Sequence, residues 1–156
     1  MSCGAELGLG AGVKLDRTGT PGVDVYEGCK IDYKGSEVNA ANFLKVLSGD
    51  TSAPGPVLKS TAQDKVFVYY TDHGGVGILG VPSGAAGGYI HAADINKAIE
   101  TLQSKGGYKE LLFYLEACES GSIFANLLKA PNAKAVTAAN PSESSWGWYR
   151  ECHIMT

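Results

Sequence analysis

The sequence predicts an α/β fold, a three-layer sandwich with a mainly parallel central sheet. Two strands are predicted, over residues 65–70 and 111–117, because the apolar runs in them end abruptly in small or polar residues, as buried strands do. A segment with helical periodicity separates them, which is the order of a right-handed crossover between parallel strands. A weaker apolar run at 133–138 follows a second short helical segment. The resulting order of strand, helix, strand, helix and strand is typical of a sheet covered by helices.

The composition is that of an ordinary globular domain. The 156 residues suit one core, and a hydrophobic fraction of 44% is usual for such a chain. A net charge of -3 gives no indication of nucleic acid or an anionic membrane surface as a partner. No apolar stretch is long enough to span a bilayer, and the first residues lack the pattern of a signal peptide. We therefore expect one domain over residues 1–156, with residues 1–12 poorly ordered; the oligomeric state is not indicated.

The cysteines are scattered and form no C-x-x-C pair. This spacing argues against a zinc site and against a disulfide framework, and no metal or cofactor is expected. Only the third cysteine in the chain follows a predicted strand, so the other three receive no functional role. The four are Cys3, Cys29, Cys118 and Cys152.

The first half of the chain contains one clear helix. Residues 13–37 are rich in turn signals and are predicted to form a surface loop region. Asn39 can cap a helix that Gly49 ends. Residues 50–62 hold two prolines and are predicted to be a linking loop. The apolar face of the helix consists of Phe43, Leu44, Val46 and Leu47.

The second half alternates strands with helices. A glycine-rich loop over 74–88 follows the first strand, and it lacks the G-K-[ST] ending of a phosphate loop. The next helix begins near His91 and ends at Gly106-Gly107. A shorter helix is predicted over 122–129, after the second strand. The buried stripe of the longer helix consists of Ile95, Ala98, Ile99 and Leu102.

His73 and Cys118 each follow the end of a predicted strand. Because the carboxyl ends of neighbouring parallel strands meet at one edge of a sheet, we expect these two side chains to face each other there. A cysteine and a histidine are the side chains that nucleophilic acyl transfer needs. A thiolate forms more readily beside an imidazolium or a helix N-terminus, and Cys118 precedes a predicted helix. Each residue alone has a plainer reading, because a lone cysteine is usually a small buried hydrophobe and a lone histidine can belong to a loop.

Three motifs resemble one family of peptidases. They are TDHGG at 71–75, EACESGS at 116–122 and TAANPSESSWG at 137–147. All three lie at the ends of predicted strands, in the order of the legumain family of asparaginyl endopeptidases, called vacuolar processing enzymes in plants. The resemblance runs from about Gly22 to Trp148 and is closest to the plant members.

The resemblance implies a caspase-like fold and a cysteine endopeptidase that cleaves after asparagine, and more slowly after aspartate at acid pH. By the same resemblance, His73 is the catalytic histidine and Cys118 the nucleophile that forms a thioester. The partners implied are peptides or proteins with asparagine at the cleavage site, and the location implied is a vacuole or lysosome. Further roles fall to the backbone N–H groups of Gly74 and Cys118 as an oxyanion hole, and to Glu116, Ser144 and Ser145 in the asparagine pocket.

The chain also departs from the family pattern. It begins after the family's first strand and stops soon after the SSWG segment, so we expect a caspase-like domain incomplete at both ends. Far less activity is expected from such a chain than from a full-length member. Two alternatives remain open: a catalytically impaired fragment or binding module of the same fold, and the related transamidase subunit that attaches glycolipid anchors. The pocket residues also have plainer readings: Glu116 as a side chain facing solvent at the strand tip, and Ser144 and Ser145 as caps of a turn.

Overall fold

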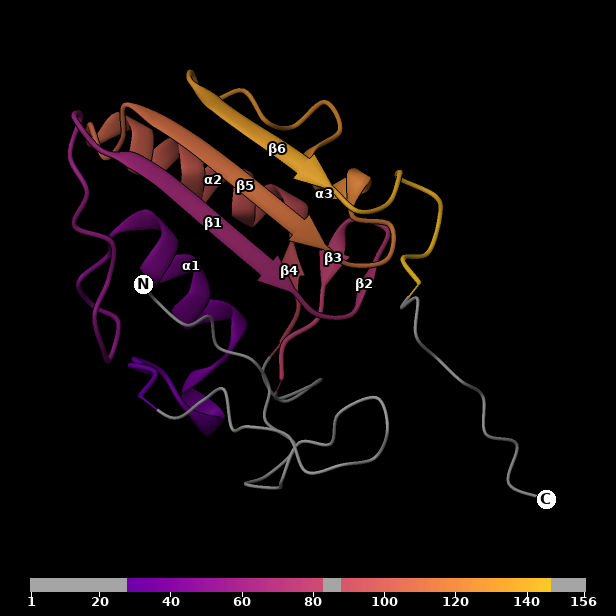
Figure 1. The fold of residues 1–156 in the computed structure, drawn as a ribbon, viewed down its shortest axis with the longest axis horizontal. Coiled ribbons are helices and arrows are strands. Elements are labelled where there is room, and N and C mark those ends of the chain that lie inside the picture. Colours follow the sequence, from indigo (N-terminus) through magenta and orange to yellow (C-terminus); the bar gives the residue numbers. More distant parts are fainter. Residues whose placement is uncertain (1–27, 83–87, 147–156) are drawn as a thin grey trace.

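A computed structural model describes residues 28–82 and 88–146 of the chain (Figure 1). Its main sheet consists of strands β1 (Lys65–Thr71), β5 (Glu110–Glu116) and β6 (Ala133–Thr137). The three strands are parallel and lie in the order β1-β5-β6. The predicted mainly parallel α/β fold is therefore confirmed, and β5 is the central strand.

The helices α1 (Ala40–Ser48), α2 (Ala92–Ser104) and α3 (Gly121–Phe124) lie behind the sheet in Figure 1. Helix α2 packs against both α1 and α3. The core between helices and sheet is mostly aliphatic, and it includes the Phe113 and Phe124 rings, whose centroids are 5.2 Å apart. The side chains with the least exposure in this core are Leu79, Ile90, Ile95, Ile99, Leu111, Phe113 and Ile123.

The opposite face of the sheet is apolar and exposed. Phe67 is 61% exposed and Tyr69 58%, and the Phe67 ring contacts Tyr114 edge-on at 5.3 Å. Val136 on β6 extends the same face and is 52% exposed. Within residues 28–82 and 88–146, no helix covers this face, so one of the two helical layers of the predicted sandwich is present in the described part. Parallel sheets are ordinarily covered on both faces.

The two longer helices begin and end where the sequence predicts. The Asn39 side chain accepts a hydrogen bond of 2.9 Å from the Asn42 backbone N–H, and Gly49 ends α1 with φ 65°. Helix α2 begins directly after His91, and its predicted stripe is buried. Gly106 has φ 66°, a conformation that glycine adopts without steric cost.

Two predictions about the second half are wrong in detail. The glycine-rich segment holds a small antiparallel sheet of β2 (Gly74–Gly75), β3 (Ile78–Leu79) and β4 (Ile90–His91). Strands of two residues are too short to show an alternating pattern, so the sequence reads as loop. The helix predicted over 122–129 ends after one turn as α3, because the chain turns at Asn126, which has φ 59°. A 3-10 turn at Gly35–Glu37 also lies in the predicted loop region.

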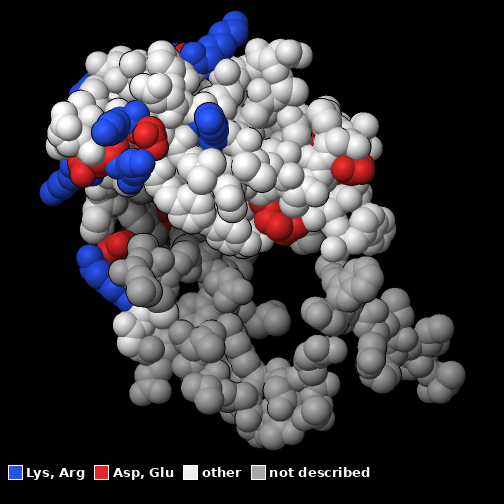
Figure 2. Space-filling view, turned by 45° about the horizontal axis from the view of Figure 1, so that its top comes forward, with Lys and Arg blue, Asp and Glu red and all other residues white. Residues whose placement is uncertain are grey.

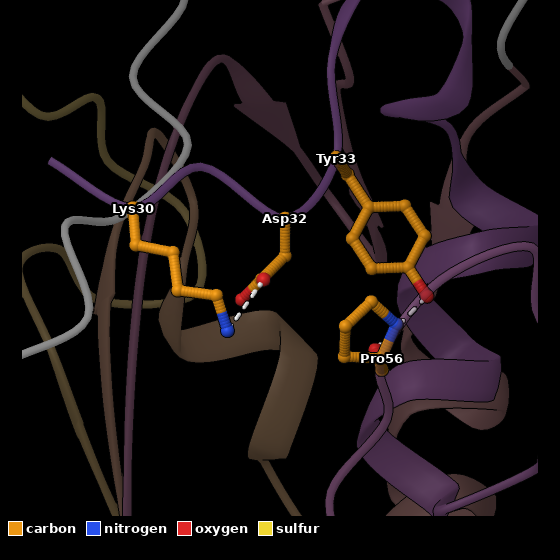
Figure 3. Close-up of polar contacts among 4 residues, drawn as sticks. All are labelled: Lys30, Asp32, Tyr33 and Pro56. Atoms are coloured by element: carbon orange, nitrogen blue, oxygen red, sulfur yellow. Dashed lines mark hydrogen bonds and ion pairs between the residues drawn. The ribbon is translucent and has the colours of Figure 1, made fainter.

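Residues 28–37 are fastened to the loop after α1. The Tyr33 hydroxyl donates to the Pro56 carbonyl oxygen at 3.0 Å, and Lys30 forms an ion pair with Asp32 at 3.1 Å (Figure 3). A Cβ added at Gly55 would stand 3.1 Å from the Tyr33 ring, so the tyrosine lies flat against that glycine. This contact holds the segment against the loop that joins α1 to β1.

Cys29 corrects the expectation of no disulfide framework, because it is disulfide-bonded. Cys118, by contrast, is a free thiol. The spacing of the four cysteines could not reveal this bond, because disulfides join residues that are close in space and not in sequence. The prediction that residues 1–12 are poorly ordered also falls outside the described part.

The charged side chains are unevenly placed. In Figure 2, the basic side chains gather at the left, where the strands begin in Figure 1, and the charged side chains visible on the right half are all acidic.

Among residues 28–82 and 88–146, none of the helices has the length and apolar character needed to cross a membrane. The same residues contain no cluster of three or more His, Cys, Asp or Glu side chains suited to a metal ion.

Candidate active site

The candidate site lies where β1 and β5 end side by side. Thr71 and Glu116 are paired in the parallel ladder, and the Asp72 N–H donates to the Glu116 carbonyl oxygen at 3.2 Å. His73 follows directly on one strand, and Ala117 and Cys118 follow on the other. The predicted adjacency of the two strand ends is therefore confirmed, and it brings the histidine segment and the cysteine segment to one edge of the sheet.

The backbone of His73 is held from both sides. The His73 N–H donates to Asp72 Oδ1 at 2.6 Å, and its carbonyl oxygen accepts from the Gly80 N–H at 2.7 Å. Gly80 in turn accepts a hydrogen bond from the Tyr70 hydroxyl through its own carbonyl oxygen. The imidazole belongs to an exposed residue, so solvent and a peptide can reach it while its backbone stays fixed.

Tyr70 has an unusual environment for a phenol. Burial is the main cause that raises its pKa above the ordinary value near 10, and the nearby negative charge of Asp72 raises it further. The Phe43 ring of α1 covers Tyr70 edge-on at 5.1 Å. The neutral phenol is thus the form that the fold stabilises, and it is the form that can donate to Gly80.

Tyr70→Phe is expected to make the free energy of unfolding less dependent on pH in alkaline solution. Because the folded-state pKa is raised, the unfolded state loses its phenol proton first, and the stabilisation present below about pH 10 declines as the pH rises. The variant should be less stable at pH 7 by about 1 kcal/mol through the lost hydrogen bond. Its free energy of unfolding should then fall less steeply between pH 9.5 and 11, by up to about 1.4 kcal/mol per pH unit.

Urea denaturation across that pH range measures this effect. Tyr108→Phe is a useful companion, because burial also raises the pKa of Tyr108 and its hydroxyl donates to the Pro131 carbonyl oxygen at 3.1 Å. Its effect should have the same sign and be smaller. Parallel curves for the wild type and Tyr70→Phe would show that the phenol does not couple to folding.

Gly74 and Cys118 are in backbone contact. A Cβ built on Gly74 would overlap the Cys118 carbonyl oxygen and would stand 2.9 Å from the Ala117 Cβ and 3.3 Å from the Cys118 nitrogen. Only a hydrogen atom fits in this space. The two backbone N–H groups proposed as oxyanion donors therefore belong to chain segments that touch each other.

Cys118 itself is half-buried at the start of a tight turn. Its Sγ lies 3.7 Å from the Ser145 carbonyl oxygen. The next residue, Glu119, has φ 50°, which a side chain rarely adopts, and its N–H donates to the Glu143 carbonyl oxygen at 2.8 Å. Because α3 has only four residues, a helix dipole adds little to the environment of the thiol.

Glu116 and Ser145 are brought together, whereas Ser144 has a different partner. The Glu116 carboxylate accepts hydrogen bonds from the Ser145 hydroxyl and, at 3.2 Å, from the Thr71 hydroxyl. The Ser144 hydroxyl lies 3.5 Å from the Glu119 carboxylate instead. Two of the three side chains expected to recognise asparagine are thus in direct contact, and the third is exposed on the other side of the turn.

Several hydrogen-bonding residues of the turn were not singled out from the sequence. Ser120 is fully buried, donates to the Ala139 carbonyl oxygen at 3.3 Å and accepts from the Ala139 N–H at 3.0 Å. The Asn96 amide of α2 donates to the Ile123 carbonyl oxygen of α3 at 2.8 Å. Small polar residues after a strand read as a turn, and nothing in the sequence tells which distant backbone they bind.

Comparison with known proteins gives consistent matches. The sequence profile of the Peptidase C13 family matches residues 14–156, which extends the expected region of resemblance at both ends. The vacuolar-processing enzyme of Vicia sativa is 51% identical over 133 residues, covering 82% of this chain and 26% of that relative.

Two further relatives match over the same share of the chain. The vacuolar-processing enzyme beta-isozyme of Arabidopsis thaliana is 47% identical and legumain of Homo sapiens 46% identical. The matched region is 27% and 30% of these relatives. The chain therefore spans between a quarter and a third of the length of the curated relatives that it matches.

Proposed function

Because the chain belongs to the Peptidase C13 family, we propose that it carries the cysteine and histidine of an endopeptidase that cleaves peptide bonds after asparagine. The observation that supports this most directly is the backbone contact between Gly74 and Cys118 at the adjoining ends of β1 and β5. It places the residue after His73 against the proposed nucleophile. No other pair of described segments joins a free thiol to a histidine in this way.

The first half of the proposed reaction forms a thioester. The Cys118 thiolate attacks the carbonyl carbon of the scissile bond, and the carbonyl oxygen takes up the negative charge. The Gly74 and Cys118 N–H groups donate to this oxyanion, and one such donor is worth roughly 3–4 kcal/mol in the transition state. The imidazolium of His73 gives its proton to the leaving amine as the C–N bond breaks.

In the second half, water replaces the amine. His73 accepts a proton from water as the water oxygen attacks the thioester, and the C–S bond then breaks to release the acid and the thiolate. An amine in place of water would give a ligated peptide with the same atoms in the same roles. The proposed substrate is a peptide or protein, and the proposed location is a vacuole or lysosome, after the relatives named above.

Glu116 and Ser145 are the proposed contacts of the asparagine side chain, with Ser144 at a greater distance. A side-chain amide presents two N–H donors, and the Glu116 carboxylate accepts hydrogen bonds only. Aspartate lacks these donors and carries a like charge when ionised, so it becomes a substrate only when protonated at acid pH. The matching family is named as a peptidase family, which favours peptide-bond cleavage over the transamidase alternative.

The test is labelling by peptide electrophiles that differ only in the terminal side chain. At pH 6 we expect the asparagine reagent to modify Cys118 at least about tenfold faster than the glutamine and alanine reagents, since each lost buried hydrogen bond costs about 1–3 kcal/mol. Mass spectrometry of tryptic peptides locates the label. Equal rates for all three reagents, or a label spread over other cysteines, would contradict the proposed function.

A further inference from the structure

The Ser122 hydroxyl joins the histidine side of the site to the cysteine side. It accepts a hydrogen bond of 2.8 Å from the Gly77 N–H and donates one of 2.6 Å to the Glu119 carbonyl oxygen. Gly77 is the turn of the β2–β3 hairpin, four residues after His73, and has φ 74°. Glu119 is the residue after Cys118. A single oxygen atom therefore bridges the two segments that meet at the sheet edge.

Both ends of this bridge are positions where the backbone needs support. Glu119 has a left-handed conformation, and its two peptide groups are fixed by Glu143 on one side and by Ser122 on the other. Residues in such conformations persist where their surroundings hold them in place, and they are frequent at active sites. The Glu119 carbonyl oxygen also accepts a hydrogen bond of 2.9 Å from the Ser122 backbone N–H. The Ser122 hydroxyl therefore adds a second bond to the turn after Cys118 and ties that turn to Gly77.

The hairpin does not depend on Ser122 to fold. Its strand pairs, Gly74 with Leu79 and Gly75 with Ile78, remain without the hydroxyl. The Gly77 carbonyl oxygen also accepts a hydrogen bond of 2.9 Å from the Ala92 N–H at the start of α2. Removing the hydroxyl would therefore release the hairpin from the cysteine turn and leave both elements formed.

We propose that Ser122 is a positioning residue that sets where His73 stands relative to Cys118. This inference rests on the proposed function, because it concerns proton transfer between these two residues and the peptide. Proton transfer is efficient only within hydrogen-bond reach. A displacement of about 1 Å in such a site can lower the rate by about a hundredfold.

The experiment compares three variants of the full chain. Ser122→Ala removes both hydrogen bonds, and Ser122→Thr keeps the hydroxyl and should restore most of the rate. Ser120→Ala is the matched control, because its buried hydroxyl also makes two hydrogen bonds, with the Ala139 backbone and not with the hairpin. Ser120→Ala should lower the stability of the fold and leave the position of His73 relative to Cys118 unchanged.

The expected result is a split between kinetic constants. Ser122→Ala should lower kcat for an asparagine peptide by about 30- to 100-fold with KM within about twofold, because ground-state binding is unchanged. The rate of Cys118 labelling should fall in parallel and change its dependence on pH between 5 and 8. Ser120→Ala should lower the melting temperature with kcat within about threefold.

The outcomes separate this inference from the function on which it rests. A wild-type chain without selective labelling of Cys118 would overturn the proposed function. A wild type that labels selectively, together with Ser122→Ala at unchanged kcat or with Ser122→Thr as impaired as Ser122→Ala, would overturn the role of Ser122 alone. An equal loss of kcat in Ser120→Ala would show that stability, and not positioning, governs the rate.

Discussion

Cys118→Ser is expected to lower peptide turnover at least about a thousandfold and to abolish labelling by the asparagine electrophile. A serine hydroxyl at this position would need a strong general base to reach the reactivity that a thiolate has by itself. Serine is slightly smaller than cysteine and has the same shape, so the half-buried position accommodates it.

The control for this variant is a test that it folds and binds peptide as the wild type does. Its melting temperature should match that of the wild type, because the contact between Cys118 Sγ and the Ser145 carbonyl oxygen is long, at 3.7 Å, and contributes little to stability. The substituted chain should still bind an asparagine peptide, which calorimetry can measure. Turnover above a tenth of the wild-type value would exclude Cys118 as the nucleophile.

Gly74→Ala is expected to have the next largest effect, because its methyl group has no room. The Cβ would overlap the Cys118 carbonyl oxygen and press on the Ala117 Cβ, and Ala117 is only 1% exposed. Both obstacles belong to the rigid end of β5, so the two strand ends must move apart. We expect kcat/KM to fall by about a hundredfold or more, as when an oxyanion donor is lost. Overpacking should also lower the free energy of unfolding by about 1–3 kcal/mol.

Gly75→Ala is the matched control for this prediction. The same atom added one residue later would meet only the Ile78 side chain, at 3.4 and 3.6 Å, which is ordinary contact. Its kcat/KM should stay within about threefold of the wild-type value. If the two alanine variants were equally active, the tight approach of Gly74 to Cys118 would have no part in the reaction.

The elements that the sequence predicts well are those with a long pattern. Strands β1 and β5 are seven residues long and apolar between their ends, and α2 repeats its apolar residues over thirteen residues. Short elements escape because two residues cannot show a period, which is why β2 and β3 were read as loop. The length of α3 escapes for another reason: Leu127 and Leu128 continue an apolar pattern, while the backbone has already turned at Asn126.

The residues of the candidate site also differ in how far the sequence could predict them. Strand ends and motifs were sufficient to single out His73 and Cys118, because both follow directly from where an apolar run stops. The hydrogen-bond partners of Ser122 and Ser144 could not be predicted from the sequence. Each partner comes from another part of the fold or depends on the course of a turn. Hydrogen-bond partners between distant segments are properties of packing, and a single sequence carries no record of them.

The pairing of β1 with β5 also determines when during folding a reactive site can exist. Thr71 and Glu116, which meet at the site, are 45 residues apart in the chain. Contacts of such separation form late, after the entropy of closing a long loop has been overcome by burial of the core. The cysteine and the histidine are therefore assembled in the same cooperative step as the core. A nascent or partly unfolded chain holds the thiol and the imidazole far apart, so it lacks the pair of side chains that the proposed acyl transfer needs.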